Sequence, residues 1–133
     1  HVAGTWDKDG NANIYLDGIL KDTVAISGTF TGSFTVAAIG NNTQSASYWT
    51  GNIDELSLFN KELDSTEVST LYNDGLPFNP KPLANMIGYW KMGDGGIVGD
   101  PIATFPTIVD ETGNNNGTMT NMTSTDFMAD VPE

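Results

Sequence analysis

The stretch from residue 48 to residue 75 constrains the fold of this chain more than any other part of the sequence. It opens with an aromatic pair and a Gly, which is typical of a turn leading into a strand. Residues 53–59 then alternate, so that Leu56 and Leu58 fall on one face and the residues between them on the other. This pattern predicts a mostly buried strand.

A short helix with complete start signals is predicted directly after this strand, over residues 64–74. Asp64 is placed to cap the helix, and Glu67, three residues later, completes a capping box. Leu63 and Val68 occupy the two positions of a hydrophobic staple, and a Gly follows where a left-handed C-terminal turn needs one. A strand that runs into one capped helix is a specific composite signal.

That composite, W-x-G-x-I-D-E-L-S-L-F-N-K-E-L-D-x-x-E-V-x-x-L-Y, resembles the closing signature of laminin-G-like, concanavalin A-like jelly-roll domains. The first residues of the chain, H-V-A-x-T-x-D followed by x-Y-x-D-G, are similar to a hairpin of the same domains. The resemblance covers residues 1–76. It implies an all-β fold, a concanavalin A-like jelly-roll β-sandwich with one short α-helix.

The remainder of the chain suggests a second beginning. Residues 77–85 are rich in Pro and read as a linker, since Pro favours an extended, semi-rigid backbone. Residues 86–133 contain a predicted strand and a D-x-x-G-N-x-N-x-G-T motif that resembles the start of a laminin-G-like domain. We favour a single sandwich that these late strands complete. The alternative is the junction of two tandem modules, and the absence of a starting Met indicates a piece of a larger protein.

Charge and composition argue against several classes of partner. The chain has 17 acidic and 5 basic residues, a formal charge of −12, so it lacks the Lys and Arg clusters that bind nucleic acid. An anionic membrane surface is disfavoured for the same reason. No apolar run has the length of a membrane span, and the absence of Cys excludes thiolate catalysis and disulfides.

Catalysis is not expected. Glycoside hydrolases that share the jelly-roll fold carry alternating carboxylates on one strand, which point into one cleft. The comparable strand here has Asn52, Asp54 and Leu56 on one side, while Glu55 points to the other. The single histidine, His1, is terminal, so no Ser-His-Asp arrangement is predicted.

Calcium is the one cofactor that the sequence suggests. Residues 7–11 superficially resemble a calcium loop, but the Gly and Glu positions do not match, and an Asp-Gly hairpin turn is the preferred interpretation. Many laminin-G-like domains bind one calcium ion at the sandwich rim. The resemblance therefore implies four candidate metal ligands: Asp17, Asp54, Asp94 and Asp110.

A carbohydrate site would need exposed aromatic rings beside polar loops. Trp49 and Trp90 lie in predicted strands and are expected in the core. Tyr48 and the polar loop before it, with Asn41 and Asn42, are the better candidates for an exposed binding site.

These observations predict a non-catalytic structural or adhesion module on the exterior of a large assembly. By resemblance, such a module would decorate a virion or fibre, or belong to an extracellular surface protein, with other structural subunits as its partners. The alternative is a calcium-assisted carbohydrate-binding module that recognises glycans. A glycoside hydrolase comes third.

Overall fold

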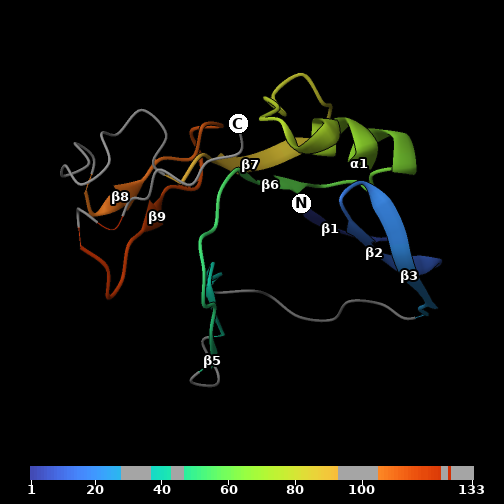
Figure 1. Ribbon diagram of the computed structural model, residues 1–133, viewed down its shortest axis with the longest axis horizontal. Helices are drawn as coiled ribbons and strands as arrows, with labels where there is room; N and C mark the ends of the chain where they lie inside the picture. Colours follow the sequence, from blue (N-terminus) through green and yellow to red (C-terminus); the bar gives the residue numbers. More distant parts are fainter. Residues whose placement is uncertain (28–36, 43–46, 93–104, 124–125, 127–133) are drawn as a thin grey trace.

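A computed structural model describes residues 1–27, 37–42, 47–92, 105–123 and 126 (Figure 1). Its first unit is an antiparallel sheet of three strands in the order β1-β2-β3, namely β1 (Val2–Trp6), β2 (Asn11–Leu16) and β3 (Ile19–Ala25). The β1–β2 connection is a hairpin turn in which the Gly10 amide donates to the Asp7 carbonyl over 3.2 Å. Asp17 and Gly18 form the next turn with φ of 51° and 70°, the left-handed region that Gly favours. The predicted hairpin of residues 1–18 is confirmed.

The predicted capped helix is also confirmed, as α1 (Ser65–Tyr72), followed by a 3₁₀ turn η1 (Asn73–Gly75). One carboxylate oxygen of Asp64 accepts hydrogen bonds from the amides of Thr66 and Glu67, both at 2.9 Å. The Glu67 carboxylate accepts in return from the Asp64 amide at 3.1 Å, which closes the capping box.

The core of this unit lies between the helix and one face of the sheet. Tyr15 of β2, Leu63 before the helix and Val68 within it are buried against one another. Ala3, Phe59 and Leu71 pack around them. In Figure 1 the helix runs beside the β1–β2–β3 sheet, and the burial of these side chains fixes it there.

The remaining strands form pairs. β6 (Leu56–Phe59) is antiparallel to β7 (Met86–Trp90), on the other side of the Pro-rich segment. Two shorter antiparallel pairs follow the same pattern: β4 (Asn41–Asn42) with β5 (Ser47–Tyr48), and β8 (Thr107–Ile108) with β9 (Gly117–Thr118). The described residues form antiparallel strands with one short α-helix, which confirms the predicted all-β class. The division into residues 1–76, 77–85 and 86–133 stays a prediction.

The signature strand differs from its prediction in length and burial. It begins at Leu56 rather than at residue 53, because Glu55 has a φ of 51°, which is incompatible with an extended strand. Leu58 is 53% exposed rather than buried, and in the described residues β6 pairs with β7 alone. Between residues 19 and 40 the structure describes β3, and residues 28–36 lie outside the described part of the chain.

The indole of Trp90 lies over Gly88. A β-carbon at Gly88 would sit 2.8 Å from Trp90 Cζ3 and closer still to its Cη2. The ring is not free to move away, because Trp90 is buried and its Nε1 donates to the Asn115 carbonyl at 3.0 Å. We expect Gly88→Ala to destabilise the fold by about 2 kcal/mol through this overlap.

Chemical unfolding of the two glycine variants checks this prediction. The matched control is Gly4→Ala in β1, where an added β-carbon meets nothing within 4 Å. Because Ala is the better strand residue, the control should unfold at the same denaturant concentration as the wild type or a higher one. Equal midpoints for the two variants would contradict the packing of Trp90 on Gly88.

Candidate functional site

The predicted carbohydrate-binding residues lie on one two-stranded arm formed by β4 and β5. Asn41 pairs with Tyr48 across this arm, and Asn42 pairs with Ser47. The Tyr48 side chain is 67% exposed, and that of the next residue, Trp49, is 63% exposed. Figure 1 shows the arm extending away from the helix and the β6–β7 pair.

Trp49 was expected in the core, and this prediction was wrong. It immediately follows β5 and precedes Gly51, so it sits at the end of the arm's short ladder rather than inside a packed sheet. Trp90, for which the same prediction was made, is buried in β7, with 9% of its surface exposed. Each of the two tryptophans follows a Tyr in the sequence. The elements packed around them make Trp49 exposed and Trp90 buried.

The Trp49 ring is held in place although it is exposed. Its backbone amide donates to the Gly40 carbonyl at 2.8 Å, and its indole Nε1 donates to the Asn52 carbonyl at 3.2 Å. Gly40 has a φ of 76°, which lets the chain turn at this residue. Gly40 lies close to the side chains of Ile53 and Trp49. A pre-positioned ring loses little conformational entropy when a ligand stacks on it.

This arm offers two exposed aromatic residues, adjacent in the sequence, and an exposed amide. Tyr and Trp provide large, rigid contact areas with a polar group at one end, which suits surfaces that bind amphipathic ligands. The Asn41 side chain is exposed at the same pair of strands. Stacking on an aromatic ring and hydrogen bonding to an amide are therefore available on the same arm.

Asp110, a predicted metal ligand, instead organises the interior of the second half. Only 1% of its surface is exposed. One carboxylate oxygen accepts from the amides of Tyr89 and Thr112, both at 2.9 Å. The other accepts from the Thr112 hydroxyl at 2.7 Å and the Asn115 amide at 2.9 Å, with longer contacts to Asn114 and to the Asn115 side chain. The carboxylate thus joins β7 to the turn that leads to β9.

These contacts decide the ionisation state of Asp110. Burial by itself raises the pKa of this carboxyl, but the hydrogen bonds from Thr112, Tyr89 and Asn115 together outweigh it and hold the pKa well below its ordinary value. The carboxylate is therefore ionised in the folded protein at neutral pH. The oxygen atoms that a cation would need are already occupied by donors.

Asp17 and Asp54, two other candidate metal ligands, do not join Asp110. Asp17 lies in the β2–β3 turn and accepts a hydrogen bond from the N-terminal ammonium at 2.8 Å. Asp54 precedes β6 and accepts from the Glu55 amide at 3.0 Å. Asp94 lies outside the described residues. Within the described parts of the chain, no three His, Asp or Glu side chains gather where they could hold a metal ion, and calcium binding stays a prediction.

The carboxylates of the signature strand are used internally. The Tyr89 hydroxyl of β7 donates to the Glu55 carboxylate, which ties the start of β6 to its partner strand. Nearby, the Lys81 ammonium donates to Glu111 at 2.7 Å and lowers the pKa of that carboxyl. Each of these acids supports the junction between the two halves of the chain.

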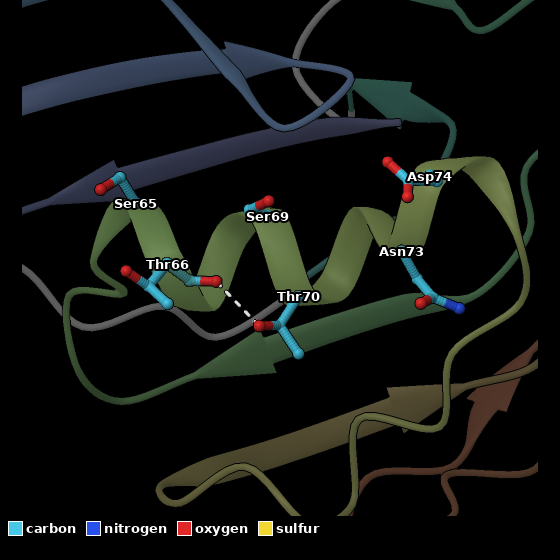
Figure 2. Close-up of a pocket in the computed structure, with 6 residues that line it drawn as sticks. All are labelled: Ser65, Thr66, Ser69, Thr70, Asn73 and Asp74. Atoms are coloured by element: carbon cyan, nitrogen blue, oxygen red, sulfur yellow. Dashed lines mark hydrogen bonds between the residues drawn. The ribbon is translucent and has the colours of Figure 1, made fainter.

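One further hollow lies on the outer side of α1 (Figure 2). Its lining is polar: Ser65, Thr66, Ser69, Thr70, Asn73 and Asp74. Figure 2 shows that these side chains point to different sides of the helix, with Ser69 and Asp74 directed away from Thr70 and Asn73. The Thr70 hydroxyl donates to the Thr66 carbonyl of its own helix at 2.8 Å. The groups do not converge on one point, so the hollow is a poorer candidate than the β4–β5 arm.

Comparison with known proteins gives one match. A family model described as the concanavalin A-like lectin/glucanases superfamily matches residues 1–69, which is more than half of the chain. No curated protein and no solved structure matches it. The described residues also include no helix that is long and apolar enough to cross a membrane.

Proposed function

Because the chain belongs to the concanavalin A-like lectin/glucanase superfamily, we propose that it is a non-catalytic adhesion module on the exterior of a larger extracellular assembly. A virion decoration or fibre protein and a cell-surface protein are the two settings that we propose for it. Its partners would be the other structural subunits of that assembly and the surface to which the assembly adheres.

The observation that carries this proposal is the exposure of Tyr48 and Trp49 on the β4–β5 arm. Exposed aromatic side chains cost free energy in water, and they are enriched where proteins make contacts. Hydrogen bonds at Gly40 and Asn52 fix the backbone and the indole of Trp49, so the arm presents this ring ready for contact. The carboxylates of Asp110 and Glu55 are instead engaged by internal donors, which supports a role without catalysis.

A glycan is the second candidate, as the ligand of this same arm. Asn41 lies directly opposite Tyr48 in the register, so an amide can bind sugar hydroxyls while a ring stacks on the sugar. In this version, calcium would assist binding at a separate place on the rim. The two candidate functions therefore differ in the ligand that the β4–β5 arm binds, which is a glycan in one and a protein subunit in the other.

Retention of the protein on immobilised polysaccharides, a neutral β-glucan and a sulfated galactan, tests the arm. We expect Tyr48→Ala and Trp49→Ala each to weaken retention by about 10- to 100-fold, since a stacked aromatic at a contact contributes about 1–3 kcal/mol. Tyr48→Phe and Trp49→Phe are the matched controls. They keep a ring at each position and should retain most of the binding.

Retention on the same immobilised polysaccharides distinguishes the calcium-assisted glycan-binding module from the structural module. Loss of retention in chelator and its recovery with calcium would favour the calcium-assisted version. Binding of the wild type to isolated assembly subunits but to neither polysaccharide would favour the structural version. Alanine variants that bind every ligand as well as the wild type would show that the β4–β5 arm is not the binding site.

A further inference from the structure

The β4–β5 arm lies within the longest stretch of the sequence that carries no charge. Residues 23–53 contain no Asp, Glu, Lys or Arg, although the whole chain has 17 acidic and 5 basic residues. Both strands of the arm and the exposed Trp49 fall inside this stretch. The first charged residues after it are Asp54 and Glu55, and both are acidic. A ligand that contacts the arm therefore meets aromatic and hydrogen-bonding groups of the uncharged kind.

The two N–H groups of Trp49 are already used inside the protein. Its backbone amide donates to the Gly40 carbonyl at 2.8 Å, and its indole Nε1 donates to the Asn52 carbonyl at 3.2 Å. An anion that has no cationic partner needs several such donors directed at it. The arm instead presents the Asn41 amide and the Tyr48 hydroxyl. These groups both donate and accept, which suits the hydroxyl groups of sugars.

The lysines of the chain do not supply the missing positive charge. Within the described residues, three of them form ion pairs: Lys8 with Asp9, Lys61 with Glu67, and Lys81 with Glu111. Lys21 lies in β3, and Lys91 follows β7 and acts on Glu111. The arm extends away from α1 and from the β6–β7 pair (Figure 1). An acidic ligand at the arm would face no neutralising side chain, and a chain of formal charge −12 would repel it.

We infer that the ligand of the β4–β5 arm is an uncharged polysaccharide and that the arm discriminates against sulfated and carboxylated polymers, an inference that rests on the proposed function because it assigns the ligand class of the same arm. Tyr48 and Trp49 offer rings on which sugars stack, and Asn41 lies opposite Tyr48 in the register. A sulfate or carboxylate brought to this surface would lose water without gaining a cation, which weakens the complex.

Salt distinguishes an uncharged glycan from a basic partner. A Lys or Arg side chain can stack on Tyr48 or Trp49, and the negative charge of the whole chain attracts it. The carboxylates that would orient such a partner lie outside residues 23–53. Binding of a basic partner would weaken as the salt concentration rises, whereas binding of an uncharged glycan would not.

Retention of the whole chain on matched immobilised polysaccharides tests the inference. The set consists of a neutral glucan, galactan and mannan, each beside its chemically sulfated form, with calcium and again with chelator. We expect retention on at least one neutral polymer, with a Kd that changes less than about 2-fold between ~0.05 M and ~0.5 M salt. The sulfated form of that polymer should bind at least about 10-fold more weakly in chelator.

Thr50→Lys adds the charge that the arm lacks. Thr50 is exposed and directly follows Trp49, so the new ammonium group would lie beside the exposed rings. It should tighten binding to the sulfated polymer by about 5-fold at low salt, and ~0.5 M salt should remove this gain. Binding to the neutral polymer should stay unchanged. Thr66→Lys, on the exposed side of α1, is the matched control, since it makes the same change in net charge away from the arm and should alter neither affinity.

Two outcomes would overturn the inference: a wild type that binds the sulfated form in chelator as tightly as the neutral one, or a wild type that binds no neutral polymer in either buffer. If Tyr48→Ala and Trp49→Ala abolish binding to the sulfated form, or to an isolated assembly subunit, adhesion through the arm stands while its proposed ligand class falls. Neutral-polymer binding that survives both alanine substitutions would instead overturn the arm as the binding site, and the inference with it.

Discussion

Replacing Asp110 by Asn should lower the free energy of unfolding by about 3 kcal/mol and the melting temperature by about 10 °C. The carboxylate accepts hydrogen bonds from two backbone amides at one oxygen and from further donors at the other. An Asn side chain has the same size but only one oxygen. Its amide group would face N–H and O–H donors, which leaves buried donors without acceptors.

The pH dependence of the unfolding free energy lost in Asp110→Asn shows whether the ionised Asp110 carboxylate causes this loss. The folded-state pKa of Asp110 lies below its ordinary value of about 4. Ionisation therefore contributes stability that is fully present above pH ~4 and is lost as the pH falls toward the lowered pKa. The difference in unfolding free energy between the wild type and Asp110→Asn should be full at pH 7 and should narrow steadily below pH 4.

Asp22→Asn is the control for this experiment. The Asp22 side chain is exposed in β3 and accepts from the neighbouring Thr23 amide at 2.8 Å, a bond that Asn also makes. Its effect should stay within about 0.5 kcal/mol at every pH. If the two Asn variants lose the same stability at pH 7, Asp110 does not organise the second half of the chain.

Leu63→Ala should cost about 3 kcal/mol as well, for a different reason. Leu63 is 6% exposed and packs with Tyr15 and Val68, so it links the helix to the sheet. Truncation removes the transfer free energy of the buried side chain and leaves a cavity beside Tyr15. It also removes half of the hydrophobic staple at the start of α1.

Denaturant unfolding, followed by circular dichroism, measures this loss, with Leu76→Ala as the control. Leu76 follows η1 and is 52% exposed, so its truncation should cost less than about 1 kcal/mol. A Leu63→Ala protein as stable as the Leu76→Ala protein would show that the helix is not held to the sheet by this contact.

Local features of the chain were predictable because their causes lie within a few residues. The capping box needs Asp64 and Glu67 three positions apart, and the structure forms it as the spacing predicts. The β1–β2 hairpin follows from alternation on both sides of an Asp-Gly turn. The all-β class follows from the same short strands and from the resemblance of residues 1–76.

Burial and side-chain roles depended on contacts between distant residues. Trp49 and Trp90 both occur in strand-like sequences, yet one ends an exposed arm and the other is covered by the turn that contains Asn115. Asp110 was a candidate calcium ligand because the family resemblance implied it. Its role is decided by the Tyr89 amide, 21 residues away, and by a turn that wraps around the carboxylate.

The sequence by itself determined the first hairpin, the capped helix and the family of this protein, because capping, alternation and turn residues act through neighbours along the chain. Only the tertiary structure decided that β6 pairs with β7 across the Pro-rich segment, that Tyr48 and Trp49 stand exposed together, and that one side of the β1–β2–β3 sheet has no cover in the described residues. The reason is physical. Whether an apolar or acidic side chain is buried, paired or free to bind is set by which distant segments fold against it.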